Sequence, residues 1–231
     1  MQCEKRPADA FAVNVALTFS ALDICEQSGN VKFLLPSTGI VYGLHLDRPA
    51  VEEDPTHPES VYTGSKLTAE ILVQAHTKGR LRGSIVARLS NVYGPGSREN
   101  TVLGRLIGQV SRNEPIRVLD ERPVRDFIHV DDTVEALVRL AETDFADALV
   151  VNVSTARGVK IGDVAEMVAK LSGLPHQTSG AANSGLSTKL VLNNSRLDRL
   201  TGWVPQIQLE DGLKICLKGS GAFNPGVEQK L

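Results

Sequence analysis

Short apolar runs alternate along this chain with longer stretches whose apolar residues recur every three or four positions. Three runs predict buried strands: VKFLLPS (31–37), SIVARLS (84–90) and LVVNVS (149–154), with PIRVL (115–119) as a weaker candidate. The helical spacing predicts helices at 10–28, 60–79, 99–113, 132–143, 160–172, 194–201 and 209–218. Strands that alternate with helices are typical of an α/β protein with a mainly parallel, doubly wound sheet.

The first helical stretch has two interpretations. Basic residues followed by a mostly apolar run resemble a signal peptide, but Asn14 interrupts the run and no A-x-A-type cleavage site ends it. Apolar residues at helical spacing favour an amphipathic helix instead: Phe11, Val15, Phe19 and Leu22. We find no run that approaches the ~18 apolar residues of a membrane span, so we expect no membrane partner.

Composition excludes several function classes. A net charge of −2 over 231 residues gives no electrostatic basis for binding nucleic acid or an anionic membrane. The three cysteines (Cys3, Cys25 and Cys216) are far apart and form no CxxC pair, which predicts neither a disulfide framework nor a metal site. Free cysteines and the lack of a targeting signal predict a reducing, cytoplasmic location.

Tyr62 and Lys66 are the first candidates for chemistry, because they lie four residues apart in a predicted helix and so share one face. A nearby ammonium group favours phenolate, so Lys66 should lower the pKa of Tyr62 and make it a general acid or base. Short motifs are unspecific, however, and most Tyr-x-x-x-Lys pairs are merely neighbours on a helix surface.

Two hydroxyl side chains strengthen the case that Tyr62 and Lys66 belong to a functional site. Ser37 and Thr38 end the predicted strand VKFLLPS, and ligands bind at the carboxyl ends of strands in open α/β sheets. Their alternative role is to cap the following turn, as Ser and Thr often do.

With these residues, the chain resembles the extended short-chain dehydrogenase/reductases, specifically the NAD-dependent sugar epimerase/dehydratase group. Five ordered blocks carry the resemblance: NVALTFSALDICEQSGNVKFLLPSTGIVYG, YTGSKLTAE, ARLSNVYGPG (87–96), RDFIHVDDTVEAL (125–137) and NNSRLDRLTGWVPQIQLEDGL. The resemblance implies an incomplete Rossmann-type sheet. Residues 1–154 would form a partial dinucleotide-binding domain with an interleaved substrate segment near 92–125, and residues 155–231 a smaller α/β substrate-binding part.

The resemblance also implies residue roles. Tyr62 would be the acid/base, and Lys66 would lower its pKa and hold the nicotinamide ribose of NAD or NADP. Thr38 would hydrogen-bond the reacting sugar oxygen, with Ser37 as the alternative. The remaining expected contacts are Asn14 with the cofactor, and Asn91 and Arg125 with the diphosphate of a nucleoside-diphosphate sugar.

Alternatives remain for Arg125 and for the state of assembly. Arg125 could instead form a surface ion pair with Glu121 or Asp126. The resemblance further implies a homodimer formed through the helices at 10–28 and 60–79.

The chain departs from the family pattern at two places. Gly39 and Ile40 stand where dehydratases and decarboxylases of the family carry acidic side chains, so epimerisation or simple oxidoreduction is favoured. The strand, GxxGxxG turn and helix that hold the cofactor pyrophosphate are not found before Phe11. Neither GPGSRE (94–99) nor GSGAFNPG (219–226) replaces them.

Two functions follow from these observations. The first is an NAD-dependent epimerase or oxidoreductase acting on a nucleotide-activated sugar. The second is a truncated, non-catalytic remnant of such an enzyme. For the chain by itself we expect no tight NAD binding, no turnover and poor solubility, because backbone amides of a glycine turn supply much of the pyrophosphate affinity.

Overall fold

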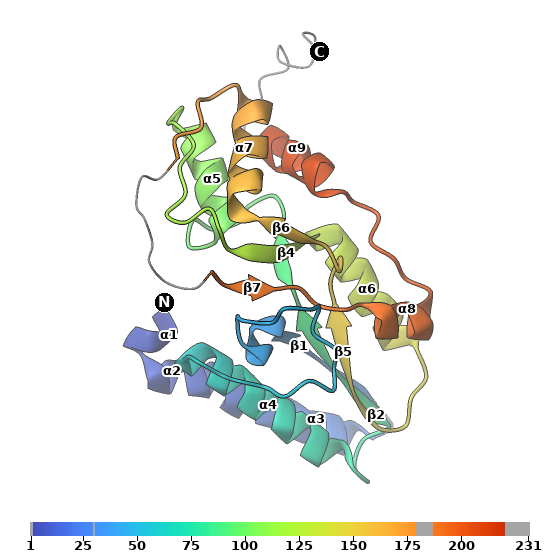
Figure 1. Ribbon diagram of the computed structural model, residues 1–231. Helices are drawn as coiled ribbons and strands as arrows, with labels where there is room; N and C mark the ends of the chain where they lie inside the picture. The colour runs from blue at the N-terminus through green and yellow to red at the C-terminus, as the bar shows by residue number, and fades with distance from the viewer. Residues whose placement is uncertain (1, 30, 179–186, 220–231) are drawn as a thin grey trace.

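The protein is an α/β structure arranged in two halves, one above the other in Figure 1. The computed structural model describes residues 2–29, 31–178 and 187–219. Strands alternate with helices, and the three central strands run parallel, as the hydrophobic pattern predicts.

The lower half contains a parallel sheet in the order β1-β2-β5: β1 (Lys32–Thr38), β2 (Gly83–Leu89) and β5 (Ala148–Val153). Helices α3 (Leu17–Ser28) and α4 (Val61–Thr77) cover one face, where Leu35 and Val86 form the core. Helices α6 (Val130–Glu142) and α8 (Ser195–Thr201) cover the other face, where Val151 and Trp203 are buried. Apolar side chains on both faces explain why the three strand segments are continuously hydrophobic in the sequence.

The upper half is built around β4 (Val124–His129). This strand pairs in parallel with β3 (Asn91–Tyr93) and β7 (Lys189–Leu190), and antiparallel with β6 (Gly158–Lys160). Helices α5 (Val102–Ser111), α7 (Ile161–Ser172) and α9 (Leu209–Gly219) pack on these strands and complete a second core. Residues after 154 contribute to both halves, since α7 and α9 lie in the upper half and α8 in the lower (Figure 1).

The start of α4 is set by local chemistry. The Ser60 hydroxyl accepts a hydrogen bond from the amide of Thr63 (3.1 Å), and the Thr63 side chain accepts one from the Ser60 amide (3.0 Å). This reciprocal pair satisfies two backbone donors at the end of the helix. It places Tyr62 in the first turn and Lys66 one turn later.

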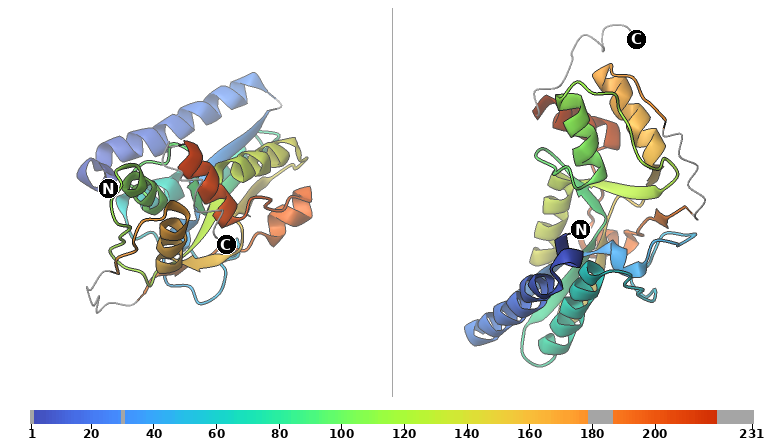
Figure 2. Two further views of the ribbon diagram at one scale, coloured as in Figure 1. Left: turned by 90° about the horizontal axis from the view of Figure 1, so that it is seen from above. Right: turned by 90° about the vertical axis from the view of Figure 1, so that its left-hand side faces the viewer.

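The predicted helix 10–28 is confirmed but begins earlier and buries a different face. After α1 (Gln2–Lys5), a helical run continues through α2 (Pro7–Phe11), a π-helical turn η1 (Ala12–Ala16) and α3. It lies beside α4 in Figure 2. The buried stripe contains Ala10, Thr18 and Leu22, whereas Phe11 and Phe19 are exposed. The expected apolar face was therefore wrong at Phe11 and Phe19, whereas Leu22 is buried and Val15 half-buried.

The expectation of no membrane-length run also needs correction. Residues 7–28 form a helix of 22 residues that contains an 18-residue window of mean hydropathy 1.4, which by length and composition alone could cross a membrane. Core helices of soluble proteins and N-terminal leader sequences satisfy the same criterion. In this structure the run packs against α4 and β1, as an outer helix of the sheet does.

The predicted strand at 115–119 is wrong. This segment is irregular and makes one isolated bridge, between Ile116 and His176, while the strand of this region is β4 at 124–129. The sequence HQTSGAANSGLST (176–188) is typical of a loop. This segment and the glycine stretch at 219–226 fall mostly on residues 179–186 and 220–231, which lie outside the described residues.

Candidate functional site

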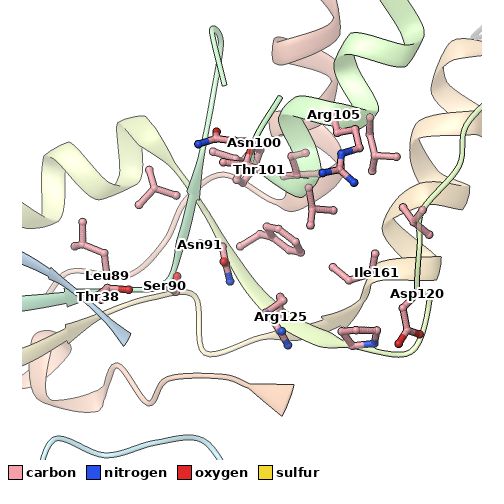
Figure 3. Close-up of a pocket in the computed structure, with 18 of the residues that line it drawn as sticks. Thr38, Leu89, Ser90, Asn91, Asn100, Thr101, Arg105, Asp120, Arg125 and Ile161 are labelled. Atoms are coloured by element: carbon pink, nitrogen blue, oxygen red, sulfur yellow. The ribbon is translucent and has the colours of Figure 1, made fainter. Parts of the chain in front are cut away.

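A cavity of about 550 Å³ lies where the carboxyl ends of β1 and β2 meet the upper half. Figure 3 shows most of its lining side chains. The lining comes from β1, β2, β3, β4, α4, α5, α7 and the segment before β4. The lining includes Ser37, Thr38, Tyr62, Asn91 and Arg125. The structure therefore brings five of the seven predicted site residues to one cavity.

Thr38 and Tyr62 lie together in the lining of this cavity. Thr38 is the last residue of β1, and its hydroxyl accepts a hydrogen bond from the amide of Ile40 (3.3 Å) at the start of the short 3₁₀ helix η2 (Gly39–Tyr42). The Tyr62 phenol is hydrogen-bonded to the Thr38 side chain. A carbonyl or hydroxyl oxygen placed between these two groups could receive hydrogen bonds from both.

The pKa of Tyr62 shifts in the opposite direction to the one expected from the sequence. Burial raises the pKa of the phenol, and the hydrogen bond from Thr38 only partly opposes this. The Lys66 ammonium donates to the carbonyl oxygen of Pro36 (2.7 Å) in β1. It is held there against the strand, which is why burial rather than the lysine charge dominates the pKa of Tyr62.

Lys66 itself is half-buried beneath the cavity and does not line it. Burial lowers the pKa of Lys66, and the charge of Glu70, one helical turn further along α4, opposes that shift. The lysine therefore keeps a nearby counter-charge on its own helix.

Ser37 and Thr38 have different partners. The Ser37 hydroxyl donates to Glu70 Oε1 in a buried contact. Since Ser37 is committed to Glu70, Thr38 is the hydroxyl that meets Tyr62, in agreement with its place as the first candidate.

Asn14 lies behind Thr38 and Tyr62, outside the cavity lining. Its Nδ2 donates to Ser65 Oγ (2.9 Å), and the Ser65 hydroxyl donates to the carbonyl oxygen of Tyr62 (2.9 Å). The π-helical turn η1 carries Asn14. Such turns are frequent at functional sites, where they redirect a side chain.

Asn91 and Arg125 supply polar groups to the middle of the cavity, between Thr38 and the side where Asp120 and Ile161 lie (Figure 3). Asn91 Nδ2 donates to the carbonyl oxygen of Asp126 (3.0 Å). Arg125 donates to the carbonyl oxygens of Val124 (2.9 Å) and Thr188 (3.1 Å) and to the Thr188 hydroxyl (2.7 Å). Burial lowers the pKa of Arg125. Among the described residues no ion pair with Glu121 or Asp126 forms, so that alternative is not observed.

Sequence reasoning missed Arg105, which projects from α5 into the same space as Arg125 (Figure 3). No motif marks it, because its position follows only from the way α5 packs over β3 and β4.

No cluster of three or more His, Cys, Asp or Glu side chains that could hold a metal ion occurs in the described part of the chain.

Comparison with known proteins connects this site to one family. The sequence profile of the NAD dependent epimerase/dehydratase family matches residues 1–154. UDP-glucuronic acid decarboxylase 4 of Arabidopsis thaliana is 29% identical over 92% of this chain. UDP-glucose 4-epimerase of Azospirillum brasilense is 30% identical over 90% of this chain and 66% of its own length. The chain spans about half the length (49%) of the plant relative.

A solved structure has a similar fold. MoeE5 in complex with UDP-glucuronic acid and NAD superposes with a TM-score of 0.81 at 30% identity, covering 90% of this chain and 71% of that one.

Proposed function

Because the chain belongs to the NAD dependent epimerase/dehydratase family, we propose that it interconverts a hydroxyl and a ketone on a nucleoside-diphosphate sugar, as an epimerase or oxidoreductase. The observation that carries the proposal is the shared cavity. A hydroxyl–phenol pair, Thr38 and Tyr62, lies at one end, and a half-buried arginine, Arg125, lies further along the same cavity. The hydroxyl–phenol pair suits proton transfer at a sugar carbon, and the arginine suits an anionic group.

Tyr62 acts in both directions of the proton transfer. The proton of the sugar hydroxyl passes to the Tyr62 oxygen as the carbon becomes a ketone, and the same proton returns when the ketone is reduced. Since burial raises the pKa of Tyr62, the phenol is protonated at neutral pH and is ready to donate to a ketone. To accept a proton it must first ionise, which requires the Lys66 ammonium to leave Pro36 and approach the phenol.

The residues present fit one end of a nicotinamide cofactor. Tyr62, Lys66 and Asn14 would hold the nicotinamide ribose, since they offer a phenol, an ammonium and an amide within two turns of α4 and η1. The cofactor, when bound, supplies the hydride acceptor and donor for the redox change. Among the described residues we find no glycine-rich turn for the cofactor pyrophosphate, so no residue is assigned to bind it.

Further along the cavity, Arg125 and Asn91 would contact the diphosphate. The planar guanidinium can offer two parallel N–H donors to phosphate oxygens, which the point charge of lysine cannot. The exposed Arg105 adds a second positive charge to the lining of the same cavity.

Packing around Gly39 favours epimerisation or oxidoreduction over elimination and decarboxylation. A Cβ atom built on Gly39 would lie 2.7 Å from Leu192 Cδ1 and 2.8 Å from Cδ2. Leu192 is completely buried, so it cannot move aside at low cost. An acidic side chain therefore has no room directly after Thr38, and Ile40 supplies no proton-transfer group either.

We also propose that two copies associate through the outward face of α3 and α4. Large apolar side chains are exposed on these helices (Leu17, Phe19, Ile24 and Ile71) and on the preceding turns of α2 and η1 (Phe11 and Val13). An apolar surface on two neighbouring helices is the kind of face that a second copy covers in a symmetric dimer.

Turnover and binding by the Tyr62→Phe variant test the proposed function. Binding is measured by calorimetry with UDP-glucose and UDP-glucuronic acid, and turnover is measured with the same sugars and NAD. Removing the phenol oxygen should lower turnover by about 100-fold or more, while the Kd for the sugar nucleotide stays within about twofold. Tyr93→Phe is the matched control, because the Tyr93 ring lines the cavity and is kept, whereas the hydroxyl that it loses donates to the carbonyl oxygen of Leu209 in α9.

Near wild-type turnover by Tyr62→Phe would refute the catalytic role. Sugar-nucleotide binding without NAD binding or turnover in the unmodified chain would instead favour a non-catalytic binding protein.

A further inference from the structure

A row of polar side chains crosses the sheet just beneath the reactive end. Ser37 of β1 is in register with Arg88 of β2, and Arg88 is in register with Asn152 of β5. All three are at least 95% buried and lie on the face that α4 covers. Earlier positions on that face are apolar, as Leu35 and Val86 show. The polar row therefore begins where the hydrophobic core ends and the cavity starts.

Glu70 of α4 joins this row. Its side chain is completely buried, and Oε1 accepts a hydrogen bond from the Ser37 hydroxyl. Oε2 accepts from both Nε (3.0 Å) and Nη2 (2.7 Å) of Arg88. One carboxylate thus connects the helix to the ends of two strands.

The row continues beyond Arg88. The guanidinium lies 4.6 Å from the centre of the Tyr42 ring, and the Tyr42 hydroxyl donates to Asn152 Oδ1 (2.9 Å). The amide of Asn152 in turn donates to the carbonyl oxygens of Ala50 (3.0 Å) and Asn193 (3.2 Å). The contacts form one continuous network across three strands.

Stability alone does not explain this network. Burying an ion pair removes two charges from water, and well-packed apolar residues often hold the same elements together equally well. Helix α4 already packs on the sheet through Ala69 and Val73, which are completely buried. The location of Glu70 is more informative. Tyr62, Lys66 and Glu70 follow one another at steps of four residues on one helix face.

We propose that Glu70, held by Arg88, is a positioning residue that fixes α4 against the ends of β1 and β2, so that Tyr62 and Lys66 face Thr38. Glu70 does not line the cavity, and it acts through Ser37, the residue directly before Thr38. This inference rests on the proposed role of Tyr62 in proton transfer.

Replacing both members of the ion pair by apolar residues separates positioning from folding. In the variant Glu70→Met/Arg88→Met neither charge is left buried without a partner, so the fold should persist. The matched control is Thr77→Val/Ser84→Ala. This pair removes a buried hydrogen bond (2.6 Å) between the same two elements, α4 and β2, roughly 22 Å along the helix from Tyr62.

Two measurements are made on the full chain. The first is steady-state turnover of UDP-glucose with NAD. The ion-pair variant should lose at least about tenfold in kcat while KM stays within about twofold, since misplaced catalytic groups slow chemistry without weakening binding. The second is ¹⁹F NMR of chain labelled with 3-fluorotyrosine. The chain has three tyrosines, so Tyr62→Phe identifies the Tyr62 resonance by its loss.

The proposal expects the Tyr62 resonance to be displaced in the ion-pair variant and unchanged in the control pair. An unchanged Tyr62 resonance in a folded ion-pair variant, or an equal loss of kcat in the control pair, overturns it. If the ion-pair variant does not fold, Ser37→Ala replaces it, because that change leaves the ion pair intact and removes only the contact with β1. Ser37→Ala should displace the Tyr62 resonance and lower kcat about threefold, and an unchanged resonance overturns the proposal.

The two proposals fail in different ways. If the unmodified chain shows no turnover, the proposed function fails, whereas the NMR comparison still decides whether Glu70 positions Tyr62.

Discussion

Arg125 carries a positive charge into a half-buried position, and in the described part of the chain its hydrogen bonds go only to two carbonyl oxygens and one hydroxyl. Burial without an acidic neighbour disfavours the charged form, which is why its pKa is lowered. Such an arginine costs free energy in the unliganded protein. An anion that enters the cavity recovers part of that cost.

The first prediction concerns this residue. Arg125→Ala should weaken binding of UDP-glucose by about 2 kcal/mol, because a charge-assisted contact with the diphosphate is lost. Thermal stability should not fall, since the substitution also removes a half-buried charge that has no acidic partner among the described residues. Calorimetric titration and thermal unfolding of the two proteins check both parts. Equal affinity would contradict the assignment, and Arg125→Lys, the control, should recover only part of the loss.

The second prediction concerns alkaline pH. Burial raises the pKa of Tyr42 from 10.0 to about 12. Between these values the unfolded chain loses the phenolic proton and the folded chain keeps it, so the free energy of unfolding falls as pH rises. By pH 11.5 Tyr42 alone should have cost about 2 kcal/mol relative to pH 8.

Urea unfolding at the two pH values measures this loss. Tyr42→Phe should show a clearly smaller decrease, although its stability at pH 8 is lower because Asn152 loses a partner. The same pH dependence in both proteins would refute the assignment to Tyr42.

At the scale of single residues, the sequence predicted most residues of the site but not the direction of the Tyr62 pKa shift. Thr38, Tyr62, Asn91 and Arg125 lie in ordered motifs, and the structure places all four at one cavity. The direction of the Tyr62 pKa shift was wrong, because desolvation depends on three-dimensional packing. The contact that holds Lys66 against Pro36 is likewise invisible in the sequence.

At the scale of elements, helices were predicted more accurately than short strands. Periodicity located the seven helices predicted from the sequence, because each buries one face. β4 was missed because its sequence, VRDFIH, places two charged residues in the strand: Arg125 lines the cavity, and Asp126 is buried. PIRVL is apolar for another reason, since Ile116 and Val118 fill the upper core from an irregular segment.

Asp126 also organises the turn after β5. It accepts hydrogen bonds from the amide (3.1 Å) and the hydroxyl (2.7 Å) of Thr155. The next residue, Ala156, adopts φ +57°, a left-handed conformation that costs alanine about 1–2 kcal/mol.

The third prediction follows from this strain. Ala156→Gly should raise the free energy of unfolding by about 0.5–1 kcal/mol, since the relief of strain exceeds the greater flexibility of glycine in the unfolded chain. Asn113→Gly is the matched control. Asn113 has φ +54°, but asparagine tolerates this conformation, so the change should be smaller. Chemical denaturation measures both, and destabilisation by Ala156→Gly would contradict the strain argument.

At the scale of the whole molecule, the two helical layers of the lower half differ in their outer surfaces. The layer of α3 and α4 exposes several large apolar side chains, among them Leu17 at 61%. The layer on the opposite face, formed by α6 and α8, exposes fewer, such as Val138 at 51%. This asymmetry supports association through α3 and α4.

The fourth prediction is that Leu17→Glu converts a dimer into a monomer. The unmodified chain should have twice the monomer mass of 24.9 kDa in solution, and the variant should have the monomer mass. The side chain is exposed, so the folded monomer should persist. Val138→Glu is the control, because it adds the same charge to the opposite layer and should leave the dimer intact. Light scattering after gel filtration gives both masses, and a dimeric Leu17→Glu variant would rule out this face.

The contribution of residues after 154 to both halves has a consequence for biosynthesis. When β5 emerges from the ribosome, the core beneath it still lacks Leu197 and Trp203, and the upper core lacks Leu213 and Leu217. Neither half can close over its hydrophobic interior until α8 and α9 have been made. The nascent chain therefore carries two open cores at once, and chaperones that shield them should associate with it until α9 has emerged.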